Sequence, residues 1–143
     1  MAITKKDLEL SGMLLHVIPQ IMRSIRGSLR GVAGSNLTVP QFRALAYVSL
    51  HPCSNKQLAG WQGVSLPAVS RMVDYLVKRR LLVRTPDPSD RRQVRLQLSK
   101  KGKEQFERLR QALQRQLAER IMTLNDPKKR MLAAGLTVLE ELF

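Results

Sequence analysis

The sequence predicts a mainly helical α+β fold, in which about six helices accompany one small antiparallel β-hairpin. Three observations predict this fold. Residues 65–80 place apolar side chains at helical spacing, and residues 93–98 alternate apolar and polar side chains as a half-buried strand does. Between them lie a second short apolar segment and a loop with two prolines. A helix followed by a hairpin is the arrangement of a winged helix.

The chain is expected to open with a long helix over residues 8–30. Its apolar side chains recur at helical spacing, and they are Met13, Val17, Ile18, Ile21, Met22, Ile25 and Leu29. Pro19 interrupts this helix, because proline lacks a backbone donor and disfavours the helical conformation of the residue before it. We therefore expect the helix to be kinked, or to restart, near Pro19. Residues 31–37 are expected to form a loop.

Two helices should follow, each with a recognisable start. Thr38 is suited to cap the first of them, with Pro40 in its first turn, and a histidine-proline pair at residues 51–52 ends it. Its inner side is expected to consist of Phe42, Leu45, Ala46 and Ser49. Ser54 and Gln57 are spaced as a capping box, which starts a short third helix.

The third helix carries the single tryptophan, Trp61. We expect Trp61 to plug the core rather than to stack on a base, because an aromatic side chain at helical spacing beside Leu58 is normally buried. The third and fourth helices together form a helix-turn-helix unit, in which the third helix crosses the DNA backbone. Phosphate contacts are therefore expected near its N-terminus, from Ser54, Asn55 and Lys56.

The fourth helix begins at Ser65 and has one buried and one exposed face. Ser65 is suited to cap it, and Pro67 is tolerated in its first turn. The buried stripe is formed by Val69, Met72, Val73, Leu76 and Val77. The opposite face carries Ala68, Ser70, Arg71 and Lys78. Small residues allow this face to approach base edges closely, and Arg71 reaches a guanine edge or a phosphate.

The hairpin is expected to present arginines on a thin projection. Its strands are predicted at residues 82–85 and 93–98. Val94, Leu96 and Leu98 should point to the core, with Gln93, Arg95 and Gln97 on the other side. Arg91 and Arg92 then lie at the tip, where a narrow minor groove attracts them. Asp90 is a poor phosphate contact, so we expect it to pair with an arginine and hold the loop in shape. Arg95 is also a candidate DNA contact.

Two helices should close the chain. Ser99 caps a long one, whose stripe consists of Phe106, Leu109, Leu113, Leu117, Ile121 and Leu124. Residues 125–127 end it and start another, whose inner side is Met131, Leu132, Leu136 and Leu139. These stripes, with that of the first helix, exceed what a small module can cover. Exposed apolar patches mark association surfaces, so the terminal helices are expected to form an intertwined homodimer.

Charge is concentrated where the motifs are. The chain has 25 Lys and Arg against 11 Asp and Glu, a net charge of +14. Residues 71–110 hold 13 of these bases and five of the acids, a net charge of +8. A basic segment that coincides with a helix and a hairpin is expected of a polyanion-binding face.

Other classes of protein are disfavoured. No run of about 18 apolar residues predicts a membrane span, and the N-terminus lacks the apolar region of a signal peptide. Because Cys53 is the single cysteine, no internal disulfide can form, and a reducing, cytoplasmic location is expected. No phosphate loop, nucleophile motif or metal-ligand spacing is present, so we predict neither an enzyme nor a cofactor.

The chain resembles the MarR family of winged helix-turn-helix transcriptional regulators. The strongest matches are the segments LTVPQFRALAYV and SLPAVSRMVDYLVKRRLLVRTPDPSDRRQVRLQLSKKGKE. The resemblance implies a homodimer that binds pseudo-palindromic promoter DNA, usually as a repressor, and that small phenolic or aromatic ligands or oxidation often release. By position it implies that Ser70 and Arg71 face DNA and that residues 87–92 form the wing, with Asp90 and Arg91 as its acid–arginine pair.

One position departs from the family pattern. The turn after the fourth helix commonly has glycine where this chain has Arg80. Glycine tolerates a left-handed backbone, which costs another residue on the order of 1 kcal/mol. Either the turn differs locally, or Arg80 adopts the left-handed conformation and gains a phosphate contact.

Two further residues are candidates for regulation. His16, on the first helix, is the best titratable candidate to line an effector pocket, although a partly buried histidine is more often structural. Cys53 is a candidate redox sensor, which requires an exposed thiol with a lowered pKa; a lone cysteine is more often buried and inert.

The sequence thus predicts a single MarR-like chain over residues 1–143. Residues 38–98 form the DNA-binding module, and residues 1–37 and 99–143 form the dimerisation module. The predicted function is sequence-specific regulation of transcription, with double-stranded DNA, a second copy of the chain and a small aromatic or phenolic effector as partners. The alternative is a non-specific or architectural protein of double-stranded DNA. The two differ in how strongly one sequence is preferred over random DNA.

Overall fold

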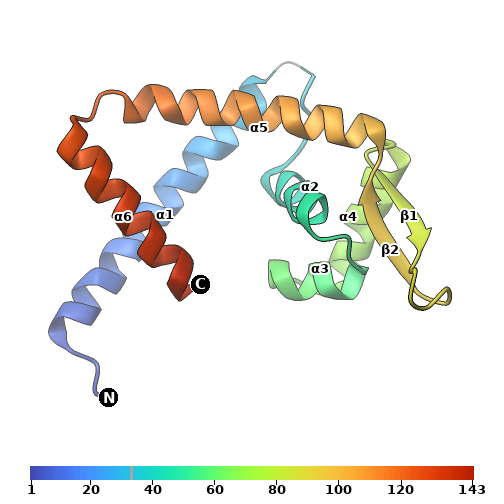
Figure 1. Ribbon diagram of the computed structural model, residues 1–143, viewed down its shortest axis with the longest axis horizontal. Helices are drawn as coiled ribbons and strands as arrows, with labels where there is room; N and C mark the ends of the chain where they lie inside the picture. Colours follow the sequence, from blue (N-terminus) through green and yellow to red (C-terminus); the bar gives the residue numbers. More distant parts are fainter. Residues whose placement is uncertain (33) are drawn as a thin grey trace.

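The computed structural model describes residues 1–32 and 34–143 (Figure 1). Over these residues the chain forms six α-helices and one two-stranded antiparallel sheet, which confirms the predicted fold class. The elements in order are α1 (Lys5–Gly31), α2 (Val39–Leu50), α3 (Asn55–Gln62), α4 (Leu66–Lys78), β1 (Leu82–Pro86), β2 (Val94–Leu98), α5 (Lys100–Ile121) and α6 (Asp126–Leu142).

Four of the predicted helix starts are confirmed, whereas α1 begins earlier than expected, at Lys5, where Thr4 caps it. Thr38 and Ser54 each form a capping box with a glutamine three residues on. Ser65 accepts a hydrogen bond from the backbone N–H of Ala68, and Ser99 accepts one from that of Gly102. These contacts satisfy backbone donors that a helix cannot satisfy within itself, and they fix where each helix begins.

The first helix does not restart at Pro19. α1 continues through this proline as one helix of 27 residues, so the alternative of a second start is wrong. The predicted loop that follows is shorter than expected, because Gly31 is the last residue of α1. Within that loop, Ala33 lies outside the described residues.

One hydrophobic core holds α2, α3, α4 and the hairpin together, and it extends into both neighbouring helices. Leu29 of α1 is 1% exposed, and Leu109 of α5 is fully buried. Phe106 of α5 packs against Phe42 of α2, with ring centroids 5.4 Å apart. The core thus crosses both of the predicted module boundaries, at residues 38 and 98.

The inner side of α2 differs in part from the prediction. Leu45 is buried and Phe42 and Ala46 are half-buried, as expected, but Ser49 is exposed. Ala44 and Val48 are buried instead. α2 packs against α3, α5 and β2, so it is buried over a wider arc than a one-sided helical stripe predicts.

The hairpin pairs Leu82 with Leu98 at its base and Pro86 with Val94 at its outer end. Leu96 and Leu98 are buried as predicted, but Val94 is 49% exposed. The alternation fails at Val94 because the hairpin extends there beyond the helices that cover its base. The backbone N–H of Leu96 also donates to the carbonyl of Cys53, at 2.7 Å, so β2 is tied to the segment before α3.

The other part of the molecule is an arm made by α6 and the first half of α1, on the opposite side from the hairpin (Figure 1). No residue of α6 is buried. Large apolar side chains are exposed along both helices, and they include Leu10, Met13, Leu15 and Ile18 of α1 and Met131, Leu136 and Val138 of α6. Within one chain this arm therefore has almost no core.

Candidate nucleic-acid interface

α4 presents the exposed face that the sequence predicts. Val69, Val73 and Leu76 are fully buried, which turns the other side of the helix outward. Arg71 and Lys78 are on that side and both are exposed, while Ala68 and Ser70 beside them are half-buried. A helix held by one buried stripe and bearing small and cationic residues outside is suited to the major groove of duplex DNA.

A hydrogen bond links α3 to this exposed face. The side-chain amide of Asn55 donates to the hydroxyl of Ser70, at 3.2 Å. Asn55 and Ser70 were predicted as separate DNA contacts, and the structure brings them together. Lys56 is exposed at the same end of α3, while the Ser54 hydroxyl accepts the backbone N–H of Gln57.

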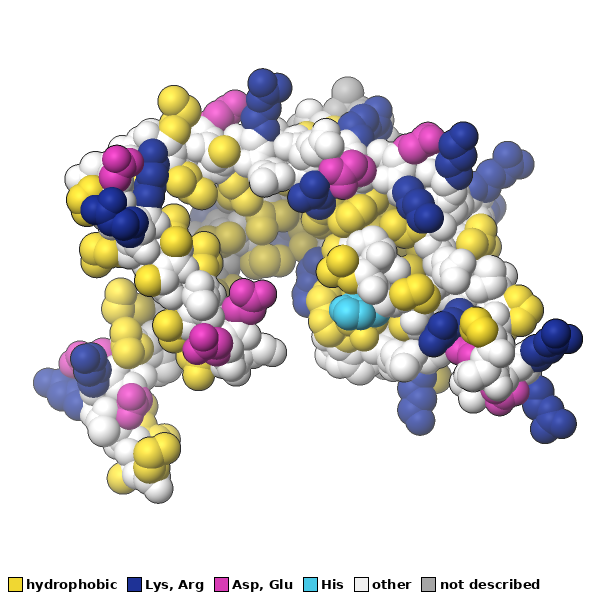
Figure 2. Space-filling view, in the orientation of Figure 1, with side chains coloured by type: hydrophobic (Ala, Val, Ile, Leu, Met, Phe, Trp, Pro, Cys, Tyr) yellow, Lys and Arg dark blue, Asp and Glu magenta, His cyan; other side chains and the backbone are white. Residues whose placement is uncertain are grey.

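The hairpin places Arg91 and Arg92 in the turn of the wing, where both are exposed. Figure 2 shows Lys and Arg side chains projecting from the end of the molecule where Figure 1 draws the hairpin. These two arginines therefore lie at the tip, as the sequence predicts.

The acidic residue that pairs with an arginine in the wing is Asp87, not Asp90. An Asp87 carboxylate oxygen lies 2.7 Å from Nε of Arg95. Asp90 instead accepts the backbone N–H of Arg92 at 3.0 Å and the side-chain amide of Gln93 at 3.3 Å. Asp90 therefore holds the loop in shape, as expected, but through the backbone of Arg92 and not through an arginine side chain. Arg95 was predicted as a DNA contact, and its Nε is engaged within the wing.

Asp87 is the site residue that the sequence patterns did not identify. Hydrogen bonds from the side chain and backbone of Ser89 hold the pKa of the Asp87 carboxyl below its usual range, and the charge of Arg95 adds to this effect. An aspartate two residues before a serine in a proline-rich loop is a common turn-forming pattern, and this signal could have identified it.

The turn from α4 into β1 resolves the question about the backbone of Arg80. Its φ is 60°, so it adopts the left-handed conformation that glycine more commonly takes. The backbone N–H of Arg80 donates to Val77 and that of Leu81 to Leu76, which closes the helix end. The side chain of Arg80 is exposed.

Trp61 does not plug the core. Its side chain is 44% exposed and stacks on Tyr47, with ring centroids 4.5 Å apart. The guanidinium of Arg43 lies 5.1 Å from the Trp61 ring centroid. The prediction was wrong because Leu58 and Ala59 are the buried residues of α3, and Trp61 packs across the surface onto α2.

Cys53 has neither property that a sensing thiol requires. It is 2% exposed, and burial raises the pKa of its thiol. A raised pKa lowers the fraction of the reactive thiolate.

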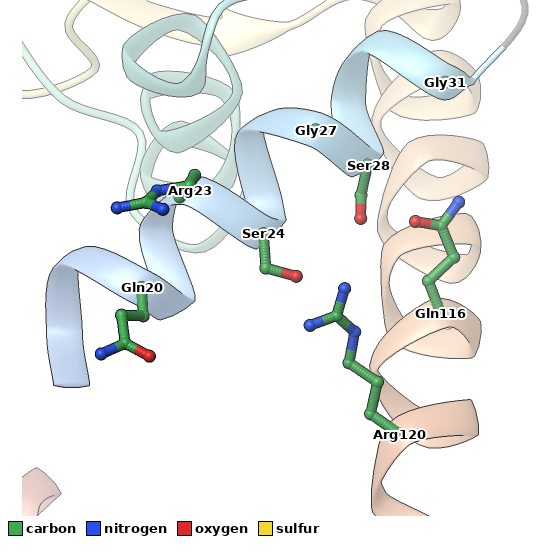
Figure 3. Close-up of a pocket in the computed structure, with 8 residues that line it drawn as sticks. All are labelled: Gln20, Arg23, Ser24, Gly27, Ser28, Gly31, Gln116 and Arg120. Atoms are coloured by element: carbon green, nitrogen blue, oxygen red, sulfur yellow. The ribbon is translucent and has the colours of Figure 1, made fainter.

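A groove of about 660 Å³ lies between α1 and α5. Figure 3 shows Ser24 and Ser28 of α1 facing Gln116 and Arg120 of α5 across this space, while Arg23 points away from Arg120. The Ser24 hydroxyl is buried with no hydrogen-bond partner among the described residues. His16 is exposed and does not line the groove; its ring is 2.8 Å from the side-chain amide of Gln20, which does.

Neither a metal site nor a membrane span is found in the part of the chain that the structure describes. No three His, Cys, Asp or Glu side chains group there as metal ligands. No helix among these residues has the length and apolar character that crossing a bilayer requires.

The helix-turn-helix, the exposed face of α4 and the arginine-tipped hairpin define a winged helix-turn-helix protein. Residues 35–93 match the sequence model of the MarR family. The resemblance seen in the sequence is confirmed, because the matched residues span the helix-turn-helix, β1 and the loop of the wing.

Individual relatives agree with this assignment. ML2140 of Mycobacterium leprae, an uncharacterised HTH-type transcriptional regulator, is 35% identical over 85 residues. The match spans 59% of this chain and 59% of that relative, which is less than two thirds of its length.

The fold is shared over nearly the whole chain with solved structures. RV1404 of Mycobacterium tuberculosis has a TM-score of 0.84 and is 28% identical, and the alignment covers 99% of this chain and 95% of that one. FabT of Streptococcus pneumoniae, solved in complex with DNA, has a TM-score of 0.73 and 20% identity, with 94% and 95% coverage. At 20% identity the likeness to FabT concerns the fold.

Proposed function

We propose that this chain is a sequence-specific regulator of transcription that binds a pseudo-palindromic operator as a homodimer. A repressor that a small aromatic acid releases from DNA is the form of this function that we favour. The observation that carries the proposal is the pairing of an exposed, cation-bearing face on α4 with an arginine-tipped wing in one module with a shared core. These two features match the two grooves of duplex DNA.

The relatives support a role in transcription. The family match covers the helix-turn-helix, β1 and the loop of the wing. The Mycobacterium leprae relative carries the description of a transcriptional regulator, and FabT was solved bound to DNA. A structural neighbour from Sulfolobus solfataricus, BldR, is likewise described as a transcriptional regulator.

The arm supports a dimer of this chain. α6 has 17 residues, none of them buried, and an isolated chain leaves the apolar side chains of α1 and α6 in water. Because two-fold dimers are the commonest oligomers and bury such faces, a second copy is the proposed partner. A dimer places two α4 helices about one DNA turn apart, which favours a palindromic site.

The groove between α1 and α5 is the proposed effector site. Its hydroxyl, amide and guanidinium groups are donors that suit the carboxylate of an aromatic acid, and the volume of about 660 Å³ accommodates one ring system. Arg120 is the proposed partner of the carboxylate. His16 lies outside the groove, and its ring contacts Gln20 at the edge of it.

The competing function is non-specific coating of DNA, which a net charge of +14 supports without any base contact. The two functions differ in the specificity ratio. A regulator binds its site about 10³- to 10⁷-fold more tightly than random DNA, whereas a coating protein gives a ratio near one.

Selection of bound sequences from a random duplex pool tests the proposal. We expect a palindromic consensus and a specificity ratio above about 10³ at physiological salt. Recovery of the pool without enrichment would establish the coating function instead. Sedimentation of the protein alone should give a dimer.

A panel of aromatic acids added to the selected complex then tests the effector site. We expect at least one acid to release DNA from the wild type, and the variant Arg120→Gln to lose this response while keeping its DNA affinity. His16→Ala is the matched comparison, because His16 lies outside the groove. A response that His16→Ala abolishes and Arg120→Gln leaves intact would assign the site to His16.

A further inference from the structure

We propose that Asp87 is the residue that positions the wing on DNA, by tying the loop that carries Arg91 and Arg92 to Arg95 on β2. This inference rests on the proposed DNA-binding function and assigns within it a role that neither the motif nor the charge of the segment predicts. Asp87 itself does not touch DNA in this role. It acts through the arginines whose loop it holds.

The contacts of Asp87 close the loop from both sides. One carboxylate oxygen accepts the backbone N–H of Ser89 at 2.7 Å, the Ser89 hydroxyl at 2.5 Å and the backbone N–H of Asp90 at 3.4 Å. The other oxygen lies 2.7 Å from Nε of Arg95. The backbone N–H of Asp87 also donates to the carbonyl of Gln93, at 2.9 Å.

The carboxylate is enclosed by these partners. The Asp87 side chain is 13% exposed, although the wing around it is almost entirely exposed. Since both oxygens are occupied and little of the side chain meets water, Asp87 is placed to organise the loop rather than to interact with a ligand.

The partner of Asp87 lies on an anchored part of the hairpin. Arg95 precedes Leu96, which is 1% exposed and whose backbone N–H donates to Cys53 at the start of the helix-turn-helix. The chain of contacts therefore runs from the buried base of β2 through Arg95 and Asp87 to the loop. The position of Arg91 and Arg92 is thereby fixed relative to α4.

This arrangement affects the affinity for DNA through the conformational entropy that the wing loses on binding. Ordering a long side chain or a loop on binding has a cost, which is removed when the free protein already holds the bound conformation. A wing held by Asp87 meets the minor groove with its arginines in place. A loose wing must be ordered at the moment of binding.

A positioning role for Asp87 predicts a change in DNA affinity opposite in sign to the change that net charge alone predicts. Asp87 is an anion in a segment proposed to approach a polyanion, so neutralising it should strengthen binding to all DNA if charge alone matters. If Asp87 positions the wing, Asp87→Asn should weaken specific binding in spite of the more favourable charge.

The experiment compares Asp87→Asn with Glu104→Gln in the full chain. Glu104 is exposed on α5 and outside the wing, so its variant makes the same change in net charge. We expect Asp87→Asn to bind the selected duplex on the order of tenfold more weakly than the wild type, with binding to random duplex not weakened. Glu104→Gln should bind both duplexes as the wild type does or slightly more tightly.

Limited trypsin digestion of the free protein tests directly whether Asp87 holds the loop of the wing. Cleavage after Arg91 or Arg92, measured by mass spectrometry against other cuts in the same digest, should be faster in Asp87→Asn than in Glu104→Gln. Arg95→Gln breaks the same ion pair from the other side and should give the same increase, so the test remains if Asp87→Asn folds poorly. An unchanged rate of cleavage in both variants would overturn the inference.

The double variant separates positioning from direct contact. If the pair acts as a unit, Asp87→Asn combined with Arg95→Gln should lose no more specific affinity than the larger single loss. Additive losses, equal losses on specific and random DNA, or tighter specific binding by Asp87→Asn would each overturn the inference. A wild type without any preferred sequence would instead overturn the proposed function, while the digestion result would still stand.

Discussion

At the scale of single residues, Arg71 carries the proposed base contact. It is exposed on the outer face of α4, one residue after Ser70. We expect Arg71→Ala to weaken binding by about 1–3 kcal/mol per half-site and to relax the base preference at one position. Lys78→Ala is the control, since removing a cation that binds phosphate weakens binding to all sequences alike. Titrations with the selected duplex and its single-base variants measure both, and an unaltered preference in Arg71→Ala would remove Arg71 from base readout.

The thiol of Cys53 should react slowly with thiol reagents. Burial raises the pKa of the Cys53 thiol. Because a raised pKa lowers the fraction of thiolate at neutral pH, the reactivity of the thiol should increase only as the pH rises towards that pKa. We expect a thiol reagent to modify the native protein on the order of 100-fold more slowly than the urea-unfolded chain at pH 8. Equal rates, followed by absorbance, would restore Cys53 as a candidate sensor.

Local signals in the sequence were sufficient for some residues and not for others. The caps at Thr38, Ser54, Ser65 and Ser99 were predictable because each depends on a side chain and a backbone N–H within three residues. The stacking of Trp61 and the ion pair of Asp87 were not, because their partners, Tyr47 and Arg95, belong to other elements. A periodic pattern gives the face of a residue but not the surface that meets it.

At the scale of elements, the junction between β1 and α5 depends on one glycine. A Cβ on Gly102 would lie 1.9 Å from the carbonyl oxygen of Leu81, which is backbone and cannot move aside. We expect Gly102→Ala to lower the free energy of unfolding by about 3 kcal/mol or more. Gly60→Ala, in α3 with nothing near the added atom, should instead raise it by about 0.5–1 kcal/mol. Urea unfolding followed by circular dichroism distinguishes the two, and a neutral Gly102→Ala would contradict the predicted close approach.

The turn between α4 and β1 combines backbone strain with an exposed cation. Arg80 has a φ of 60°, a conformation that costs a non-glycine residue on the order of 1 kcal/mol. Arg80→Gly should therefore stabilise the fold by about that amount. If the side chain also contacts a phosphate, the same variant should bind DNA more weakly, with a log–log salt slope smaller by about one unit. Increased stability, measured by urea unfolding, with unchanged DNA binding would leave the left-handed arginine without a role in DNA contact.

The elements themselves were largely predictable. Helical and alternating patterns of apolar residues predicted the approximate position of all eight described elements, because most of these elements bury a row of apolar side chains. The patterns failed where an element meets several neighbours or none. α2 is buried over a wide arc, Val94 extends beyond the core, and α1 accommodates Pro19 without interruption.

At the scale of the whole molecule, the chain divides into a module with a core and an arm without one. The charged segment and the winged helix coincide, so the module itself carries the surface proposed to meet DNA. The arm is different. Its helices were predicted by the same periodicity as the others, yet they bury almost nothing within one chain. Sequence periodicity identifies an apolar face but does not say which molecule covers it.

The arm yields the prediction that tests the proposed assembly. Leu136 is 55% exposed on α6, and a dimer formed by the terminal helices would bury it. We expect Leu136→Glu to convert the dimer to a monomer in sedimentation and to weaken operator binding with it, because one subunit holds only one half-site. Arg130→Gln makes the same change in net charge on the same helix while leaving its apolar side chains intact, and it should remain dimeric. If Leu136→Glu sediments as the wild type does, the interface does not lie on this face of α6, and the spacing of half-sites must be set by another surface.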